Sequence, residues 1–402
     1  MKTLYCFYDM AVSPCSYDFF TFLYSAEICR LRRRKSEIKL IIIQGPSNRF
    51  RQDHIRTSQQ NEIFFNNVIV PGISILPSCT SFSWSDRNDL HSMTIPIDCM
   101  YPRGYSIPQP ISEYTGRELT ASKIRQDIPG CFKAPDYAKQ LVSSFVNEQL
   151  NGQKYVTITA REILRDNVNN TRTLDQNVWQ NVITELEKRN IRTVLVRDTN
   201  HAHSTQKLLY DVIESPEAAI HLPFRMALYE GATVNFCKNN GPGVLQLFSK
   251  NTNMYFNEFD PDVIALSPTW FEKNYGMVEG SQLPMSRNCN VYKWGEEIES
   301  DILEFFYKTM DNQIDTSPNY SFNNEENLIK SVEVALGVLC TNIAYNILEE
   351  DIILFECLSK LATIFNFKQS IVETMEGQTG TILPSTKLDE FLNKVREVGL
   401  LD

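Results

Sequence analysis

The sequence has 402 residues, of which 42% are hydrophobic and 22% charged, and its formal net charge is −10. This balance is typical of a globular protein, and the length exceeds one ordinary hydrophobic core, so we expect two domains. The negative charge argues against a general nucleic-acid or anionic-membrane surface, and no apolar run approaches the roughly 20 residues that span a bilayer, so we expect at most peripheral membrane contact.

The chain opens with a β–α–β pattern. Residues 4–8 and 39–43 are apolar runs that predict buried parallel strands, and residues 18–31 carry an apolar stripe that predicts a helix. A solvated helix end is favoured over a phosphate or acidic-lipid contact for the basic cluster that closes this helix, because cations suit a helix C-terminus. The cluster comprises Arg30, Arg32, Arg33, Arg34 and Lys35.

Residues 61–71 predict a helix that leads into a strand at 68–70. Residues 71–135 are rich in Pro, Ser and Tyr and predict long loops, which in compact proteins are more often functional than idle. Residues 134–150 predict a helix, and we place the domain boundary after residue 150.

The second domain repeats the alternation of strands and helices, followed by a tail that reads as helical. Its expected strands are 154–159, 192–196, 232–237, 254–256 and 263–266, and its expected helices are 174–188, 206–214 and the segment that ends at Gly231. The expected C-terminal helices are 297–310, 325–346, 352–365 and 388–398. We favour a tail that braces the two domains over one that binds a partner.

Residues 224–248 combine a helix, a strand, a glycine loop and a new apolar run. Such a unit can direct backbone N–H groups from a helix N-terminus toward a phosphate beside a parallel sheet. On the local sequence alone, a tight turn that binds nothing is the favoured alternative.

Polar residues follow several strands of the second half, and the carboxyl ends of parallel strands meet at one edge of a sheet, where ligands bind. Arg161 directly follows a strand, and its guanidinium could hold a phosphate or pair with Glu162 or Asp198. A structural salt bridge is favoured for Arg225. Tyr229 and Glu230 are expected to pack or cap.

Other chemistry has weak support in the sequence. Asp260-Pro261-Asp262 formally matches the D-x-D metal motif, but its proline favours a plain turn. His201 and His203 lie in a polar segment and are expected at the surface. No G-x-S-x-G, G-x-G-x-x-G or Walker lysine motif is present, so hydrolase, dehydrogenase and P-loop functions are unsupported. We expect no metal and no cofactor.

The ten cysteines are scattered and contain no C-x-x-C pair. Several lie in apolar runs, which is typical of reduced, buried thiols and not of a disulfide framework or zinc site. Tyr8 and Asp9 interrupt the N-terminal apolar run that a signal peptide would need. We therefore expect a cytoplasmic protein.

Several motifs occur in a characteristic order. They are Y-D-x-A-V-S-P-x-S-Y-D-F, E-x-x-F-x-N-x-I-V-P, Y-P-x-G-Y, V-x-D-T, F-R-x-A-L-Y-E-x-A-x-x-N-x-x-x-N-G-P and G-x-Q-L-P, together with a strand that ends in R-E before an Asn/Arg-rich loop. Over roughly residues 1–300 the chain resembles uncharacterised bacterial proteins of surface-polysaccharide gene clusters, which are similar to glycosyltransferases of the GT-B fold. The resemblance implies an α/β protein with two Rossmann-like domains that face a cleft, at 1–150 and 151–296, and leaves the helical extension 297–402 unexplained.

The resemblance implies that the second domain binds a nucleotide-sugar donor and that a glycan or lipid-linked acceptor enters from the first. The implied donor-binding residues are Arg161, Asn169, Asp198, Asn239, Asn240, Gly241, Gly243, Gln282 and Trp294. Family members usually have R-N-S where this chain has Asn169-Asn170-Thr171, which leaves the role of that loop open. An inverting enzyme also needs a base, for which Asp9 and Asp18 are candidates, although Asp18 could equally cap a helix.

The sequence is therefore compatible with three functions. The first is a glycosyltransferase of polysaccharide biosynthesis. The second is a non-catalytic binding protein that keeps the GT-B shell and acts through its C-terminal helices. The third is an enzyme related to sugar-nucleotide epimerases, which share the two-domain shell.

Overall fold

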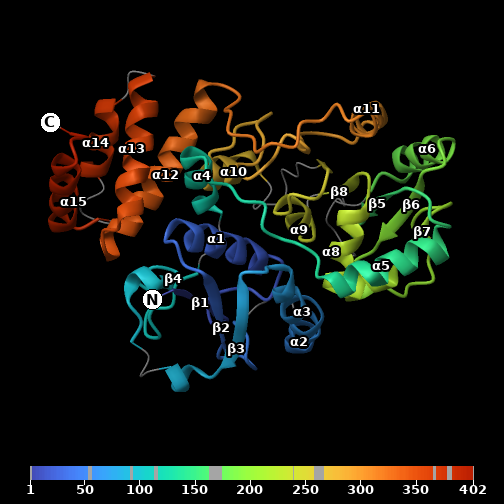
Figure 1. Cartoon of the computed structure of the whole chain (residues 1–402), viewed down its shortest axis with the longest axis horizontal. Coiled ribbons are helices and arrows are strands. Elements are labelled where there is room, and N and C mark those ends of the chain that lie inside the picture. Colours follow the sequence, from blue (N-terminus) through green and yellow to red (C-terminus); the bar gives the residue numbers. More distant parts are fainter. Residues whose placement is uncertain are drawn as a thin grey trace.

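The computed structural model describes residues 2–52, 57–90, 94–112, 116–162, 174–238, 240–257, 267–364, 368–377 and 383–401. It contains two parallel β-sheets, and this confirms the predicted α/β class. Figure 1 shows the first sheet below the centre, the second sheet at one end of the molecule and the C-terminal helices at the other.

The first sheet has the strand order β3-β2-β1-β4. Its strands are β1 (Thr3–Asp9), β2 (Glu37–Ile43), β3 (Cys79–Ser85) and β4 (Met100–Tyr101). The predicted β–α–β opening is confirmed, because α1 (Asp18–Arg32) connects the parallel strands β1 and β2. The chain then crosses from β3 to β4 on the other side of β1, so the topological switch point of this sheet lies between β1 and β4.

The predicted strand at 68–70 is wrong, and the chain there is helical. The helical run comprises α2 (Ser58–Phe64), a π-helical turn (Phe65–Ile69), α3 (Val70–Gly72) and a 3₁₀ turn (Ile73–Ile75). Phe64, Phe65, Val68 and Ile69 are buried together, a spacing that fits one helix face. The third strand is instead β3, which reads CTSFSWS and lies at the sheet edge, where most of its side chains are exposed and an apolar run is not needed.

The second sheet has the order β10-β9-β8-β5-β6-β7. Its strands are β5 (Tyr155–Thr159), β6 (Arg192–Val196), β7 (Ile213–Glu214), β8 (Asn235–Lys238), β9 (Met254–Asn257) and β10 (Asn290–Lys293). Numbered within this sheet the order is 6-5-4-1-2-3, which is the Rossmann order and puts its switch point between β5 and β8.

The helices of the middle of the chain include the four that were predicted at 134–150, at 174–188, up to Gly231 and at 297–310. They are α4 (Arg117–Arg125), α5 (Asp136–Gln149), α6 (Gln176–Glu187), α7 (Pro216–Ile220), α8 (Leu222–Gly231), α9 (Gly243–Leu247), α10 (Pro268–Tyr275) and α11 (Glu299–Met310), with short 3₁₀ turns at Arg87–Leu90, Ile97–Cys99 and Thr199–His201. The predicted loops at 71–135 are wrong where β3, β4 and α4 lie. The predicted helix at 206–214 is also wrong, because Asp211 has φ +58°, which ends any helix, and β7 begins two residues later. The predicted strand at 263–266 lies outside the described residues.

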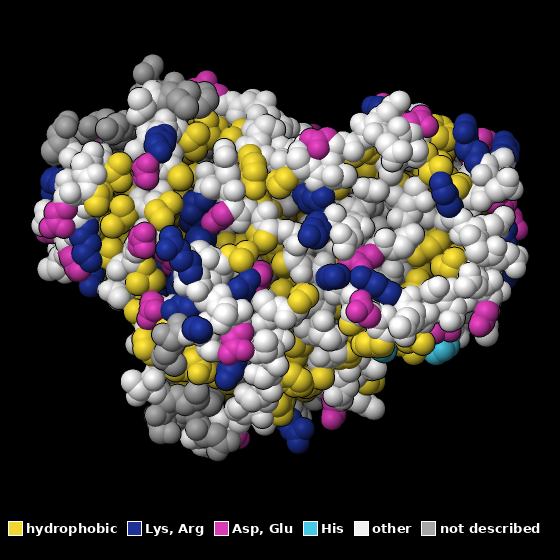
Figure 2. Space-filling view, viewed as in Figure 1, with side chains coloured by type: hydrophobic (Ala, Val, Ile, Leu, Met, Phe, Trp, Pro, Cys, Tyr) yellow, Lys and Arg dark blue, Asp and Glu magenta, His cyan; other side chains and the backbone are white. Residues whose placement is uncertain are grey.

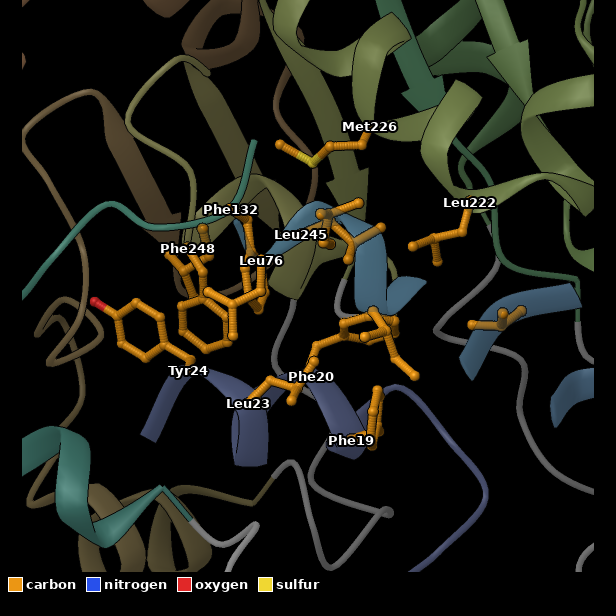
Figure 3. Packing of buried hydrophobic residues seen from close by; sticks show 14 of the residues in the cluster. Phe19, Phe20, Leu23, Tyr24, Leu76, Phe132, Leu222, Met226, Leu245 and Phe248 are labelled. Atoms are coloured by element: carbon orange, nitrogen blue, oxygen red, sulfur yellow. The ribbon is translucent and has the colours of Figure 1, made fainter. Parts of the chain in front are cut away.

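One hydrophobic core extends from the first sheet to the second through α1. Figure 3 shows Phe20 and Tyr24 of α1 directed toward Phe132 and Phe248, which belong to the part of the chain around the second sheet. The rings of Tyr24 and Phe248 stack with centroids 4.0 Å apart. The two sheets are therefore joined by a packed apolar contact along α1.

The C-terminal helices form a second core with α4. They are α12 (Glu325–Tyr345), α13 (Glu349–Ile364), α14 (Lys368–Gly377) and α15 (Ser385–Glu397). Ala121 and Ile124 of α4 lie inside this core. Among the helices of the described residues, α12 alone is long and apolar enough to cross a bilayer, and half of its apolar window is buried inside the protein.

The prediction of a solvated basic end for α1 is wrong at Arg32 and Arg33. Arg33 Nη2 lies 2.9 Å from Glu350 Oε1 at the start of α13, and Arg32 pairs with Glu118 of α4. Arg103, in the loop after β4, also pairs with Glu350. Buried ion pairs of Glu350 thus join the C-terminal tail to the first part of the chain, and their partners lie too far apart in sequence to be predicted from a local charge run.

The cysteines are free thiols, and charges of both signs cover the face of the surface in view. No disulfide joins any of the ten cysteines, and seven of them are buried. Figure 2 shows acidic and basic side chains interspersed over the face in view, without a patch of one sign.

Candidate functional site

The switch point of the second sheet gathers the polar residues that follow β5 and β8. Arg161 is half-buried and lies two residues beyond the end of β5. Asn240 and Gly241 follow β8, the neighbouring strand. Because the connections of the chain diverge here, this edge is where a sheet of this order offers room for a ligand. Two predicted donor contacts, Asn169 and Asn239, lie outside the described residues.

Asn240 fixes the shape of the loop after β8. Its side chain is buried, with Nδ2 donating to Thr159 O at 3.1 Å and Oδ1 accepting from Gly243 N at 3.2 Å. Val244 N and Leu245 N donate to the carbonyls of Gly241 and Pro242. The first N–H groups of α9 are therefore engaged within the turn, and the loop is tied directly to the end of β5.

Gly241 brings this loop against the first part of the chain. A Cβ placed on Gly241 would lie 2.4 Å from Cδ2 of Tyr17, so a side chain there would collide with the ring. Tyr17 precedes α1 in the loop that follows β1. The loop beyond β1 of the first sheet thus touches the loop beyond β8 of the second.

Arg225 lies beneath this contact. The side chain is 2% exposed, and its Nη1 donates to the Tyr17 hydroxyl at 2.7 Å. The other nitrogens donate to backbone carbonyls, Nε to Ala218 O and Nη2 to Arg197 O. The salt bridge predicted for Arg225 is wrong, because this side chain bonds neutral oxygens.

Glu162, which follows β5, bonds to both Arg197 and Asp198, which follow β6. The carboxylate of Glu162 pairs with Arg197, and Asp198 Oδ2 accepts from Glu162 N at 2.7 Å. Burial raises the pKa of Asp198 above its usual value. The expected packing of Tyr229 is confirmed by its buried hydroxyl, which lies 2.8 Å from Thr159 Oγ1.

Gln282 and Trp294 lie at the far side of the same sheet. Gln282 Nε2 donates to Tyr292 O at 3.0 Å and its Oε1 accepts from Tyr292 N at 2.7 Å, and Trp294 Nε1 donates to Ser281 O. These bonds hold β10 to the segment before it. Because β9 and β8 lie between β10 and β5, these side chains are about 14 Å along the sheet from Arg161 at the usual strand spacing.

The two candidate bases lie in different surroundings. Asp9 ends β1 and is fully buried, with its oxygens 2.6 and 2.7 Å from Arg87 Nη2 and a further hydrogen bond from Tyr105 Oη at 2.8 Å. Asp18 is exposed as the first residue of α1, where Tyr17 and not Asp18 is the capping residue. Burial raises the pKa of Tyr275 in α10, and the negative charge of Asp18 raises it further.

In the described part of the chain, no group of three or more His, Cys, Asp or Glu side chains is placed to hold a metal ion. The Asp260 and Asp262 pair lies outside the described residues. A surface pocket of about 380 Å³ lies between α4, α10 and α12, and its Lys330 is paired with Glu272 and Glu333.

Comparison with known proteins gives similarity at the level of solved structures. No family model and no curated protein matches the sequence. The chain is similar to the glycosyl transferase family 9 from Veillonella parvula DSM 2008, with 10% identity, a TM-score of 0.39, and coverage of 83% of this chain and 97% of that chain.

Two further structures are of TibC. The dodecameric iron-containing heptosyltransferase TibC in complex with ADP-D-β-D-heptose has 14% identity and a TM-score of 0.32, with 64% of this chain and 58% of that chain covered. The iron-containing dodecameric glycosyltransferase TibC from enterotoxigenic E. coli H10407 has 14% identity and a TM-score of 0.31, with 63% and 57% covered. The chain thus spans less than two thirds of the length of TibC.

Tyr17 and Arg225 are the residues of this site to which the sequence analysis gave no ligand-binding role. Arg225 carried one signal, because it is the one charge inside the apolar run of residues 222–229. Tyr17 was named only as part of the motif Y-D-x-A-V-S-P-x-S-Y-D-F, since its importance depends on Gly241, more than two hundred residues away.

Proposed function

We propose that this chain is a GT-B-like glycosyltransferase that moves a sugar from a nucleotide-diphosphate donor to a glycan or lipid-linked acceptor. The observation that carries the proposal is the contact of Tyr17 with Gly241, because it joins the loop after β1 of one parallel sheet to the switch point of a second sheet with Rossmann order. A donor bound at that switch point would face the first sheet and the loop that bears Asp18. The order of the sequence motifs supports the same class.

In this proposal Arg161 holds the donor diphosphate. It follows the central strand of the sheet, and its guanidinium keeps its charge and can bond two phosphate oxygens. Asn240, Gly241 and Gly243 shape the loop against which the diphosphate lies. The remaining predicted donor contacts are Asn169, Asp198, Asn239, Gln282 and Trp294. The last two would reach a distant part of the donor, given their place beside β10.

Of the two carboxylates, we propose Asp18 as the general base. In an inverting transfer the acceptor hydroxyl attacks the anomeric carbon, the bond from that carbon to the diphosphate breaks, and the hydroxyl proton passes to the base. Asp18 is exposed and its charge acts on Tyr275 of α10, whereas Asp9 is buried and bonded to Arg87. The positive charge of Arg161 would stabilise the leaving diphosphate.

The proposal is tested by nucleotide binding. We expect one of ADP, GDP, UDP or CDP, or a sugar derivative of it, to raise the thermal stability, by about 2.7 kcal/mol at 100 times its dissociation constant. Arg161→Ala should abolish this effect while the fold, followed by circular dichroism, stays intact. The matched control is Arg189→Ala, which removes an exposed arginine that stacks on Tyr307. Calorimetric titration that finds no bound nucleotide, or equal binding by Arg161→Ala, contradicts the proposal.

The two alternatives make different predictions. A binding protein that acts through its C-terminal helices would bind its partner with their exposed faces, while the opposite faces pack on α4 and on one another. An epimerase-like enzyme would release a free, epimerised sugar, so product analysis separates it from a transferase.

The absence of disulfides among the cysteines supports a cytoplasmic location as part of the proposal.

A further inference from the structure

Arg225 differs from the other buried arginines in the described part of the chain. Arg103 and Arg197 are 5% and 4% exposed, and each pairs with two carboxylates, Glu350 and Asp351 for the first and Glu162 and Glu214 for the second. Arg225 is 2% exposed and forms no ion pair. A buried charge without a counter-ion is unfavourable, so its presence requires an explanation.

The hydrogen bonds of Arg225 leave capacity for an anion. A guanidinium has five N–H donors, and each nitrogen of Arg225 makes one bond, to Ala218 O, Arg197 O and the Tyr17 hydroxyl. The two carbonyls are parts of the protein frame that hold the guanidinium in place. The Tyr17 hydroxyl is the one acceptor that comes from a side chain, and it leaves if that side chain rotates.

The position of Arg225 links it to the switch point. Its Nη2 reaches the carbonyl of Arg197, the residue after β6, and Tyr229, one helical turn further along α8, bonds Thr159 at the end of β5. The ring of Tyr17 lies directly against Gly241 in the loop after β8. Tyr17 therefore occupies the space between Arg225 and the backbone of the loop that is proposed to face the diphosphate.

A phosphate oxygen is a better acceptor for this guanidinium than a phenol. It carries the negative charge that the neutral partners of Arg225 do not supply. An arginine can also bind two phosphate oxygens at once with short, charge-assisted hydrogen bonds. Glycine at 241 leaves the backbone open to a close approach from the Tyr17 side. Asp198, whose charge also acts on Arg225, remains outside ion-pair distance and leaves the guanidinium available.

We propose that Arg225 is a diphosphate-binding residue of the donor site. The Tyr17 hydroxyl accepts the hydrogen bond of the guanidinium in the absence of ligand and is displaced when the diphosphate binds. The inference rests on the proposed function, because the ligand it names is the diphosphate of the nucleotide sugar. Inorganic pyrophosphate has the same chemistry without the nucleoside, so it separates recognition of the anion from recognition of the donor.

The test compares Arg225→Lys and Tyr17→Phe with the wild-type full-length chain by calorimetric titration with inorganic pyrophosphate and with ADP, GDP, UDP and CDP. Arg225→Lys keeps the charge but loses the fork, and we expect affinity for the bound anion to fall at least tenfold. Tyr17→Phe keeps the ring and removes the competing acceptor, and we expect affinity to rise about threefold to tenfold. The matched control is Tyr24→Phe, which loses a hydroxyl from α1 that bonds Pro129 O, and its affinity should equal the wild-type value.

The outcomes separate this inference from the proposed function. A nucleoside diphosphate that binds Arg225→Lys as tightly as wild type leaves the function standing and overturns the inference. Pyrophosphate binding that requires Arg225, with no gain in affinity from any nucleoside, supports the inference and overturns the function. A tenfold loss in Tyr17→Phe overturns the displacement, because the hydroxyl would then bind the ligand itself. Wild-type protein that binds neither pyrophosphate nor any of the nucleotides overturns both.

Discussion

Arg103 and Arg225 are both buried where separate parts of the chain meet, and the two regions treat the charge in opposite ways. The first joint is the contact of α1 and the loop after β4 with the start of α13. Here Arg103 pairs with Glu350 and Asp351, and Arg33 pairs with the same glutamate. The second joint is the contact of the loop before α1 with α8 and the loop after β8. Here Arg225 donates hydrogen bonds to two backbone carbonyls and to the hydroxyl of Tyr17. Matched charges make the first joint a fixed structural contact, and the unmatched charge makes the second a place for an anion.

The largest expected effect comes from removing the first joint. Deleting residues 325–402 strips the cover from Ala121 and Ile124 of α4 and leaves Arg32, Arg33 and Arg103 without Glu350. We expect the shortened chain to lose its cooperative thermal transition, measured by calorimetry and near-ultraviolet circular dichroism.

Deleting only residues 399–402 is the control, because the last turn of α15 stays in place and the transition should be preserved. A shortened chain, 1–324, that unfolds cooperatively near the wild-type temperature would contradict the bracing role and favour a detachable partner-binding module.

A single substitution tests the same joint at smaller scale. Glu350→Ala leaves buried guanidinium groups unpaired, and we expect the free energy of unfolding in urea to fall by about 3–5 kcal/mol. Glu356→Ala removes the exposed pair with Lys360 on the same helix and should cost about 0–0.5 kcal/mol. Equal effects of the two substitutions would show that the buried cluster contributes no more than a surface pair.

The same cluster gives a pH dependence. Burial alone would raise the pKa of Glu350, but the charges of Arg33, Arg32 and Arg103 outweigh burial and hold that pKa at about 2. Because the folded pKa is below the unfolded value, the stabilisation is present above pH ~4.5 and is lost as the pH falls toward 2. The stability difference between wild type and Glu350→Gln, about 3 kcal/mol at pH 7, should therefore shrink as urea titrations move from pH 5 to pH 3.

The smallest expected effect tests the contact between Gly241 and Tyr17 at the second joint. Gly241→Ala places a methyl group on the Tyr17 ring and should lower the free energy of unfolding by about 1–3 kcal/mol. In Tyr17→Ala the ring is gone, so the added methyl should cost less there, and a double-mutant cycle measures the difference. Gly337→Ala is the control, since it lies within α12 with nothing within 4 Å and should be neutral or stabilising. Additive effects of the two site substitutions would contradict the contact.

The parts of this fold that the sequence predicted are those whose signal is local. The runs that became β2 and β6 are continuous and β-branched, and the apolar stripe of α1 recurs at the helical period, so each can be recognised without knowledge of its neighbours. The strand β3 was missed because an edge strand needs little apolar surface. Only residues 68–70 of this helical run were predicted as a strand, because Val68, Ile69 and Val70 are β-branched and aliphatic.

The candidate site shows the same limit. The strand ends at Arg161 and Asn240 could be placed on one edge from the order of elements, because parallel strands share a direction. The contact of Tyr17 with the loop after β8, the ion pair of buried Asp9 with Arg87 and the lack of a carboxylate within ion-pair distance of Arg225 depend on packing between distant segments. No periodicity or spacing in the chain records those contacts.

The pairing of Arg33 with Glu350 also fixes an order of events during synthesis. The two residues are 317 positions apart. At about 5–20 residues per second, a ribosome needs about 15–60 s to travel from one to the other. During that interval Arg33 and Arg103 lack the carboxylates of α13, and Ala121 and Ile124 of α4 lack the C-terminal helices that cover them. The N-terminal region therefore cannot complete its native packing until the helix that carries Glu350 has emerged.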